Sequence, residues 1–322
     1  MSHQEDGLRP EEFAEAAEAA IQDAIKGEAG QVSSTLAEAG LLGVCTSEKS
    51  NGLGLDLRFA IPLAQAAGRL RLRFALAEQI LLARCFAGSE IASSLALGLQ
   101  LATIAWQGST EDTWIGHARR VQDARWLLVR HQAGAVLLDV LDAPRQSDRN
   151  LDPENPQVWL NVTQCPVVSY LDQNTTEALW RDGALLMAAT VHGAAEYALN
   201  AAVEHTSTRV QFERPLSSKQ AIRHWLSRMK LYHEAAGTSI ARALNENEWG
   251  ATRDPFPVLS TNLKYATFII EKSIQLHGGM GFTWDIPLHH ALREVRKIDA
   301  AWDGSALTQD IGRRFMESIG SQ

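Results

Sequence analysis

Three short segments in the C-terminal half of this 322-residue sequence carry residue types that could bind an anion or move a proton. The first spans 205–215 and places Arg209 between two stretches of helical spacing. The second, 275–281, reads QLHGGMG and puts a glycine pair at the end of another helical stretch. The third, 302–305, reads WDGS and places the carboxylate of Asp303 on a short turn.

Each segment has a plain structural explanation when it is taken singly. A glycine pair at a helix end lets backbone N–H groups approach a phosphate or an adenine edge, but it is also a common helix stop. An arginine at a helix end is most often a solvated charge, and an aspartate on a turn is most often a helix cap. The functional prediction therefore rests on the order and spacing of all three segments.

The residues around these segments predict a mainly α-helical chain with a small β domain. Residues 1–102 are rich in Ala, Leu and Glu at helical spacing and predict an N-terminal helical domain, broken at Gly40 and at the NGLG loop of 51–54. Residues 103–170 hold short apolar runs bounded by Gly, Pro, Asp and Asn, which predicts a small β domain. In 171–322 apolar positions recur at steps of three and four, which predicts a C-terminal four-helix bundle.

Composition and charge exclude several classes of protein. The chain is 45% hydrophobic and 21% charged, as ordinary globular proteins are. Its formal charge of −8 argues against a nucleic-acid partner, because phosphate binding needs a basic face. The three cysteines are far apart, which argues against a disulfide framework and a zinc site, and no metal is expected. Without a long apolar stretch or an apolar N-terminus, we expect a cytoplasmic protein.

Taken together, the three segments resemble the acyl-CoA dehydrogenase family. Its members carry R-x-Q-F-G-x-P-I with a Gln some residues on, then Q-x-x-G-G-x-G, then Y-E-G-T near the C-terminus. The corresponding segments here are 209–216 with Gln220, 275–281 and 302–305. The sequence LAEAGLLG at 36–43 also resembles the opening helices of the family, and ARWLLV at 124–129 resembles one of its strands. The resemblance covers nearly the whole chain, and it implies that the small β domain is a β-barrel-like module between the two helical parts.

This resemblance implies an FAD-dependent enzyme that desaturates an acyl-CoA thioester between its α and β carbons. A base removes the α-proton as the β-hydride leaves for the flavin, and Asp303 matches the catalytic carboxylate. Arg209 and Phe212 match positions that contact the FAD of a neighbouring subunit, where a guanidinium fork suits the pyrophosphate. The remaining positions that match cofactor contacts are Gln220, Gln275, Gly278, Gly279, Gly304 and Ser305.

Departures from the family pattern point to a divided assembly. Asp303 is one methylene shorter than the usual Glu, Trp302 replaces the usual Tyr, and Asp182 is the alternative carboxylate where some relatives place the base. The family's T-E-P-x-x-G-S-D loop and W-I-T-N strand, which hold the flavin ring, have no convincing counterpart here. The chain thus resembles the shortened subunits of heterotetrameric acyl-CoA dehydrogenases of bacterial sterol side-chain degradation. That implies a homologous partner subunit, a substrate such as a steroid side-chain CoA ester, and an electron-transfer flavoprotein as acceptor.

Three alternatives stay open at this point. The chain could form a self-sufficient homo-oligomer. It could be a nitroalkane-oxidase-like flavoenzyme, because that relative carries Asp where dehydrogenases keep Glu. It could also be a non-catalytic subunit that stabilises an active partner.

Overall fold

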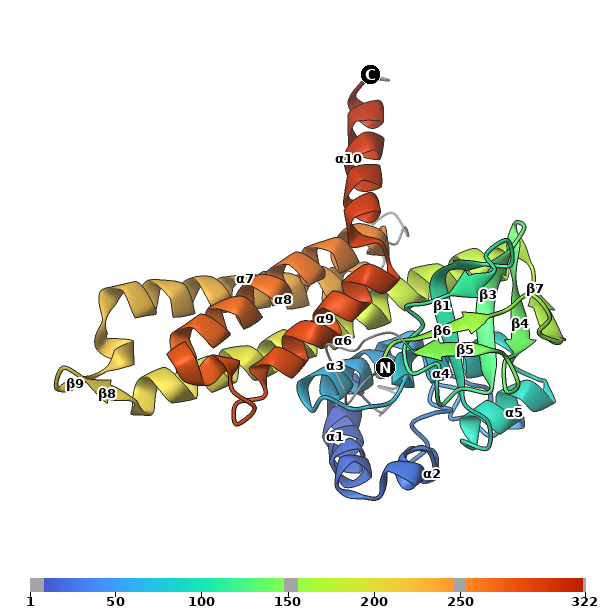
Figure 1. Cartoon of the computed structure of the whole chain (residues 1–322), viewed down its shortest axis with the longest axis horizontal. Helices are drawn as coiled ribbons and strands as arrows, with labels where there is room; N and C mark the ends of the chain where they lie inside the picture. Colours follow the sequence, from blue (N-terminus) through green and yellow to red (C-terminus); the bar gives the residue numbers. More distant parts are fainter. Residues whose placement is uncertain (1–8, 148–155, 246–252, 321–322) are drawn as a thin grey trace, which may run out of the picture.

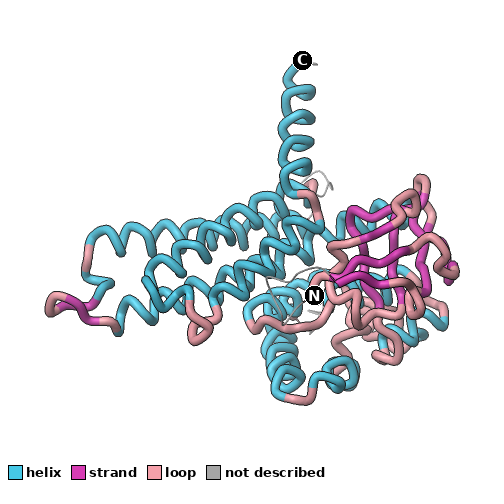
Figure 2. The backbone as a smooth tube through the Cα atoms, in the orientation of Figure 1, coloured by secondary structure: helices cyan, strands magenta, loops and turns pink. Residues whose placement is uncertain are grey.

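The computed structural model describes residues 9–147, 156–245 and 253–320. Helices form both ends of the chain and strands form its middle (Figures 1 and 2). The predicted fold class, mainly α with a small β domain and a C-terminal bundle, is confirmed.

The N-terminal part is built from short helices. They are α1 Pro10–Lys26, α2 Val32–Glu38, α3 Ala60–Arg69, α4 Leu76–Cys85 and α5 Glu90–Ala96, with 3-10 turns at Ala29–Gln31, Glu48–Ser50 and Leu57–Phe59. Gly40 follows α2 with a φ of 73°, so the predicted break is a left-handed residue that glycine adopts without strain. Ser89 caps α5, because its hydroxyl oxygen accepts from the backbone N–H of Ala92.

The β module contains two small sheets packed face to face. Its strands are β1 Ala102–Ser109, β2 Trp114–Ile115, β3 Trp126–His131, β4 Gly134–Asp139, β5 Arg145–Ser147, β6 Val158–Asn161 and β7 Val167–Leu171. One sheet has the order β1-β3-β4-β7 and the other β2-β6-β5, with β1 parallel to β3. Leu127, Val136 and Leu160 lie in the buried aliphatic core that the two sheets share. The apolar runs predicted as strands are β3, β4, β6 and the start of β7.

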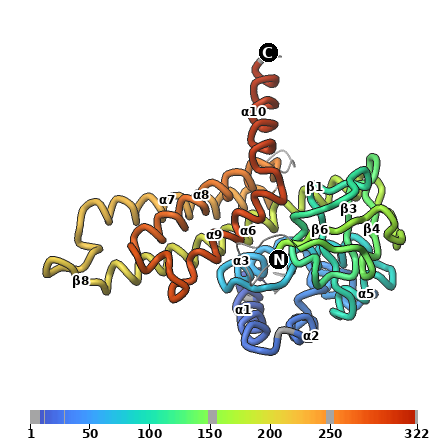
Figure 3. The backbone as a smooth tube through the Cα atoms, viewed as in Figure 1, coloured from blue at the N-terminus to red at the C-terminus, as the bar shows by residue number. Residues whose placement is uncertain are grey.

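The C-terminal part is a bundle of long helices. They are α6 Gln173–Thr208, α7 Gln220–Leu244, α8 Pro255–His277, α9 Leu288–Ala301 and α10 Gly304–Gly320. A hairpin of β8 Val210–Gln211 and β9 Arg214–Pro215, followed by a 3-10 turn at Leu216–Ser218, joins α6 to α7, and the 3-10 turn Gly278–Phe282 follows α8. Asp172 caps α6 and Asp254 caps α8, whose first residue is proline. α10 projects away from the bundle, on the side opposite α1 (Figure 3).

α6 is the wall shared by all three parts. A Cβ on Gly68 of α3 would lie 1.9 Å from the carbonyl oxygen of Thr190, and a Cβ on Gly193 would lie 1.9 Å from that of Gln65. The two glycines therefore let α3 and α6 cross in backbone contact. On another face α6 packs against α8, where the Ser273 hydroxyl donates to the carbonyl of Ala198 at 2.8 Å. Within the described ranges, no helix is both long and apolar enough to cross a membrane.

Candidate functional site

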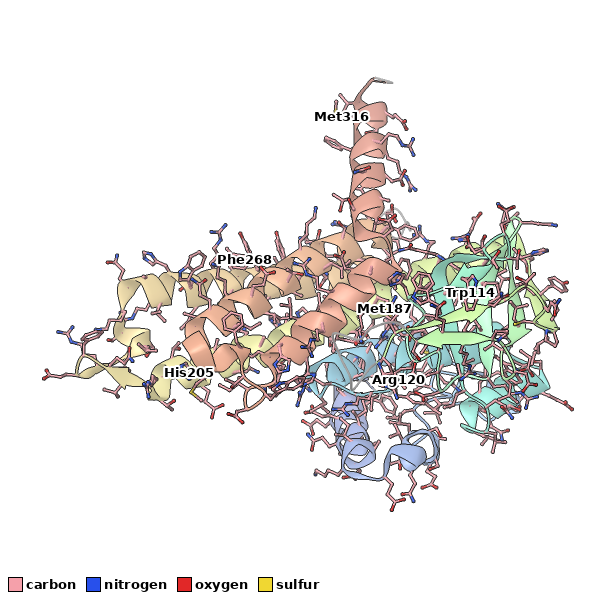
Figure 4. The ribbon with its side chains drawn as sticks, viewed as in Figure 1. Trp114, Arg120, Met187, His205, Phe268 and Met316 are labelled. Atoms are coloured by element: carbon pink, nitrogen blue, oxygen red, sulfur yellow. The ribbon has the colours of Figure 1, made fainter. Side chains whose placement is uncertain are left out.

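The sequence-predicted residues fall into two clusters at opposite ends of α6. Near its start, Gly183 faces Trp106 so closely that a Cβ there would lie 2.3 Å from the indole ring. Near its end, His205 stacks on His277 of α8 with ring centroids 4.3 Å apart. Residues 183 to 205 of a helix span about 33 Å, at roughly 1.5 Å per residue. His205 accordingly lies far from the β module, whereas Met187 lies close to it (Figure 4).

The helix-end cluster comprises Arg209, Phe212, Gln220, Gln275, Gly278 and Gly279. Arg209 follows α6 as an exposed residue, and its carbonyl accepts from the backbone N–H of Leu216 at 2.9 Å, which closes the β8–β9 hairpin. Phe212 and Glu213 form the two-residue tip, with φ of 54° and 63°. A type I′ turn needs two such residues and favours glycine, so Glu213 holds a strained conformation where the family keeps Gly. Phe212 is 86% exposed.

The glycine side of this cluster is an open stretch of backbone. Gly278 has a φ of 63°, and a Cβ on Gly278 or Gly279 would meet no atom within 4 Å. Gln275 is exposed, and its side-chain carbonyl accepts from the ammonium of Lys272 at 2.8 Å. Gln220 is the exposed first residue of α7. Because His205 stacks on His277, Arg209 and the glycine pair lie at the same end of the bundle.

The turn cluster comprises Trp106, Trp180, Trp302, Asp303, Gly304 and Ser305. The buried ring of Trp106 stacks on that of Trp302, with centroids 4.5 Å apart and an interplanar angle of 25°. It also meets Trp180 edge to face at 5.4 Å, and the Trp180 indole N–H donates to the carbonyl of Trp106 at 3.1 Å. The indole N–H groups of Trp106 and Trp302 are buried without an acceptor among the described residues. An unmet donor of this kind costs about 1–3 kcal/mol.

Asp303 lies on the turn between α9 and α10, as predicted. Its φ is 43°, its side chain is exposed, and one carboxylate oxygen accepts from the backbone N–H of Ala306 at 3.1 Å. Asp303 is therefore the N-cap of α10 in this structure. A Cβ on Gly304 would lie 1.9 Å from a carboxylate oxygen of Asp299, so a larger residue there would require the Asp299 side chain to move. Ser305 is exposed in the first turn of α10.

The alternative carboxylate, Asp182, is held in an ion pair. It pairs with Arg84 at 2.5 Å, and its side chain is 27% exposed. Burial raises the pKa of Asp182, while the adjacent guanidinium of Arg84 opposes that shift. The Asp182 carboxylate would have to leave this ion pair before it could accept a proton from a substrate.

A buried ion triad beside the turn cluster was not predicted from the sequence. The guanidinium of Arg119, in the loop before β3, donates to Glu78 of α4 at 3.2 Å and to Glu294 of α9 at 2.6 Å. Its Nη1 atom also lies 3.7 Å from the sulfur of Met187 on α6. Burial alone would lower the pKa of Arg119, but the two carboxylates outweigh it and raise the pKa above its ordinary value. The triad thus joins all three parts of the chain.

The comparisons with known proteins agree with this architecture. The family model described as "Acyl-CoA dehydrogenase, C-terminal domain" matches residues 176–309, from α6 into α10. One chain of a variant of the Tcur3481-Tcur3483 steroid ACAD superposes with a TM-score of 0.84, covering 97% of this chain and 98% of that one at 21% identity. Residues 176–309 of this chain are therefore similar to the C-terminal domain of acyl-CoA dehydrogenases, and the whole chain has an acyl-CoA dehydrogenase fold. Its structural neighbours also include the ChsE4-ChsE5 complex from Mycobacterium tuberculosis, with a TM-score of 0.79 at 17% identity over 96% of this chain and 97% of that one.

The curated relatives that this chain matches are longer proteins. "Acyl-CoA dehydrogenase FadE34" of Mycobacterium tuberculosis is 27% identical over 292 residues, which is 84% of this chain and 40% of that relative. "Acyl-CoA dehydrogenase IpdE2" of the same organism is 32% identical over 130 residues, 37% of this chain and 38% of that relative. The chain thus matches about two fifths of the length of each.

The family is flavin-dependent, and the two clusters differ in how well they fit FAD. The helix-end cluster fits the adenosine and pyrophosphate half, because it offers an exposed guanidinium and open glycine backbone. The turn cluster does not fit the flavin ring in this structure. Trp106 and Trp302 are in direct contact there, and the side-chain amide of Gln107 donates to the carbonyl of Ala300, which ties β1 to the end of α9.

Proposed function

We propose that this chain is one subunit of an FAD-dependent acyl-CoA dehydrogenase that desaturates an acyl-CoA thioester between its α and β carbons. In this proposal the chain holds the adenosine half of an FAD whose ring lies in a partner chain. The supporting observation is the separation of the two clusters along α6, by about 33 Å. The helix-end cluster is open, whereas the turn cluster is filled by the stacked indole rings of Trp106 and Trp302. One FAD cannot serve both clusters of the same chain.

Each residue of the helix-end cluster has a proposed role. Arg209 donates to the pyrophosphate, and the exposed ring of Phe212 covers the same group from the hairpin tip. Gly278 and Gly279 let the adenosine half approach an open stretch of backbone, where the N–H of Gly278 donates to the carbonyl of Gln275, and Gln275 and Gln220 lie beside the adenosine. When bound, FAD supplies the acceptor for the hydride that leaves the β carbon.

The proposed partner is a homologous subunit in a heterotetramer. Two of the structural neighbours are named as pairs, Tcur3481-Tcur3483 and ChsE4-ChsE5. α10 stands away from the body, with Met316 near its tip (Figure 4), and its exposed apolar side chains include Phe315, Met316 and Ile319. An apolar face of this kind is typical of an interface.

The named structural neighbours suggest the substrate and the electron acceptor, and the three free cysteines suggest the compartment. We propose a steroid side-chain CoA ester as substrate, since one neighbour is named a steroid ACAD. An electron-transfer flavoprotein is the proposed acceptor. The cytoplasm is the proposed compartment, in keeping with three free cysteines, Cys45, Cys85 and Cys165.

Arg209→Gln tests the cofactor role. Purified alone, the chain is expected to be colourless, and purified with its homologous partner it is expected to be yellow. In that assembly Arg209→Gln should weaken FAD about 10- to 100-fold, because a charge-assisted hydrogen bond contributes roughly 1.5–3 kcal/mol. FAD retention is measured by flavin absorbance after dialysis, with the exposed Arg242→Gln on α7 as control. Equal retention in both variants, or a yellow lone chain, would contradict the proposed division.

Asp303→Asn separates two proposed roles for this chain within the assembly. In the first, Asp303 is the base that takes the α-proton, and the substitution lowers turnover by at least about 100-fold. In the second, the chain is a non-catalytic support, and turnover stays within about threefold. We expect the smaller effect, because the Asp303 carboxylate is exposed and caps α10. Turnover by the assembled enzyme, set against its FAD content, is the measurement.

A further inference from the structure

A cavity of about 550 Å³ lies on the far side of the ion triad from the tryptophans. It is enclosed by α1, α3, α6, α9 and the loop that carries Arg119 and Arg120. A volume of this size is within the range of small-molecule sites, about 300–1,000 Å³. Much of its lining is apolar, formed by residues such as Val32, Ala67, Leu72, Phe74 and Ala194.

The order of contacts along α6 separates this cavity from the turn cluster. Gly183 meets Trp106, Met187 meets the guanidinium of Arg119, and Thr190 and Ala194 line the cavity. Arg119, held between Glu78 and Glu294, therefore stands between the tryptophans and the cavity. The cavity is a second compartment and not an extension of the Asp303 turn.

The charged residues of the cavity are strongly unbalanced in an otherwise acidic chain. Its lining includes four arginines, Arg71, Arg73, Arg119 and Arg120, against the single carboxylate of Glu294. Arg119 and Glu294 are paired with each other. The guanidinium of Arg71 lies 5.3 Å from the ring centre of Tyr197 and has no carboxylate partner among the described residues. Glu78 also pairs with Arg119, and Asp123 pairs with Arg120, so Arg71 supplies the positive charge at the rim that the described carboxylates do not balance.

Arg120 adds a buried donor and a strained backbone. Its Nη2 pairs with Asp123 at 2.7 Å, but its Nε is buried without a hydrogen-bond partner among the described residues. Arg120 and Arg71 have φ of 53° and 57°, the left-handed region that side chains other than glycine rarely adopt. Such a conformation costs about 1–2 kcal/mol per residue and is concentrated at binding sites. Arg71 and Arg120, which both line this cavity, share this left-handed conformation.

We propose that this cavity binds an apolar monocarboxylic acid, with its carboxylate at Arg71 and Arg120 and its hydrocarbon body against the α1–α3–α6 wall. A carboxylate accepts two parallel hydrogen bonds from a guanidinium, and the guanidinium of Arg71, which has no carboxylate partner among the described residues, is the type of donor it needs. The apolar wall favours an acid over a bare anion, because a bare anion leaves that wall uncovered. This site is independent of the proposed dehydrogenase role, since neither cluster of predicted residues lines it.

Isothermal titration of the full chain with sodium octanoate tests the site, with octan-1-ol and inorganic phosphate as comparison ligands. Octanoate is expected to bind saturably at one site, at least about tenfold more tightly than either comparison ligand. Arg71→Gln and Arg120→Gln should each weaken octanoate about tenfold or more, since each removes a charged hydrogen bond. Arg58→Gln, an exposed arginine of the same N-terminal part, is the matched control and should bind octanoate as the wild-type chain does.

Thermal unfolding of each variant establishes that it is folded before the titration is interpreted. Octanoate binding that is unchanged in both arginine variants would overturn the proposal. Octanol binding as tightly as octanoate would reduce the cavity to an apolar site, and phosphate binding as tightly would reduce it to an anion site. Either result also overturns it. None of these readouts depends on flavin or turnover, so failure here leaves the proposed function standing.

Discussion

Replacing Arg119 with Met is expected to destabilise the folded chain by about 3–5 kcal/mol. Glu78 has a fully buried side chain, Arg119 is 11% exposed and Glu294 27% exposed, so the substitution leaves carboxylates in a poorly solvated site without a cation. The cost comes from that uncompensated charge more than from the lost attraction, because an ion pair taken out of water gains little net stability. The free energy of unfolding, measured by urea denaturation at neutral pH, is the readout.

Two further variants show whether the buried charge is the cause. Adding Glu78→Gln to Arg119→Met should recover a large part of the loss, since it removes the most deeply buried carboxylate. Arg125→Met removes an arginine whose pair with Asp139 is much more exposed, and should cost no more than about 1 kcal/mol. If Arg119→Met lowered the free energy of unfolding no more than Arg125→Met does, the triad would not be the contact that holds the three parts of the chain together.

The fold class was predictable because its signals are local. Helices α6, α7 and α8 show apolar positions at steps of three and four, and β3 and β4 are short apolar runs between breakers. β2 and β5 were not predicted, since β2 has two residues and β5 is fully exposed. A short exposed strand leaves no hydrophobic pattern to detect.

The candidate site was predictable only in part, because its geometry depends on contacts between distant segments. The order of the three motifs placed Arg209 and Gly278 at helix ends, but that these ends lie at the same end of the bundle depends on the packing of α6 against α8, which includes the His205–His277 stack. The turn at Asp303 was predicted. The exposure of the Asp303 side chain and the stacking of Trp302 on Trp106 were not predicted, because no local pattern links a β strand to the end of α9. Arg119 was missed for the same reason.

Lowering the pH from about 6.5 to 4 is expected to remove about 3 kcal/mol of stability through His192. The His192 ring is buried between α3 and α7 and stacks on His233 with centroids 4.0 Å apart. Its Nε2 lies 3.2 Å from the carbonyl oxygen of His233, and its Nδ1 lies 3.3 Å from the amide nitrogen of Gln65. The neutral ring satisfies both, donating from Nε2 and accepting at Nδ1. A second proton would face the amide N–H of Gln65.

The direction of this pH dependence follows from the two pKa values. Burial, and then the neighbouring His233, lower the pKa of His192 from 6.5 to about 4 in the folded chain. Between those pH values His192 is protonated in the unfolded chain but neutral in the folded chain, so the free energy of unfolding falls as the pH falls. His192→Gln cannot titrate, and should flatten this part of the stability curve even if it lowers stability at neutral pH. The exposed His224→Gln should leave the slope unchanged, and an equal slope in His192→Gln would assign the acid loss to other groups.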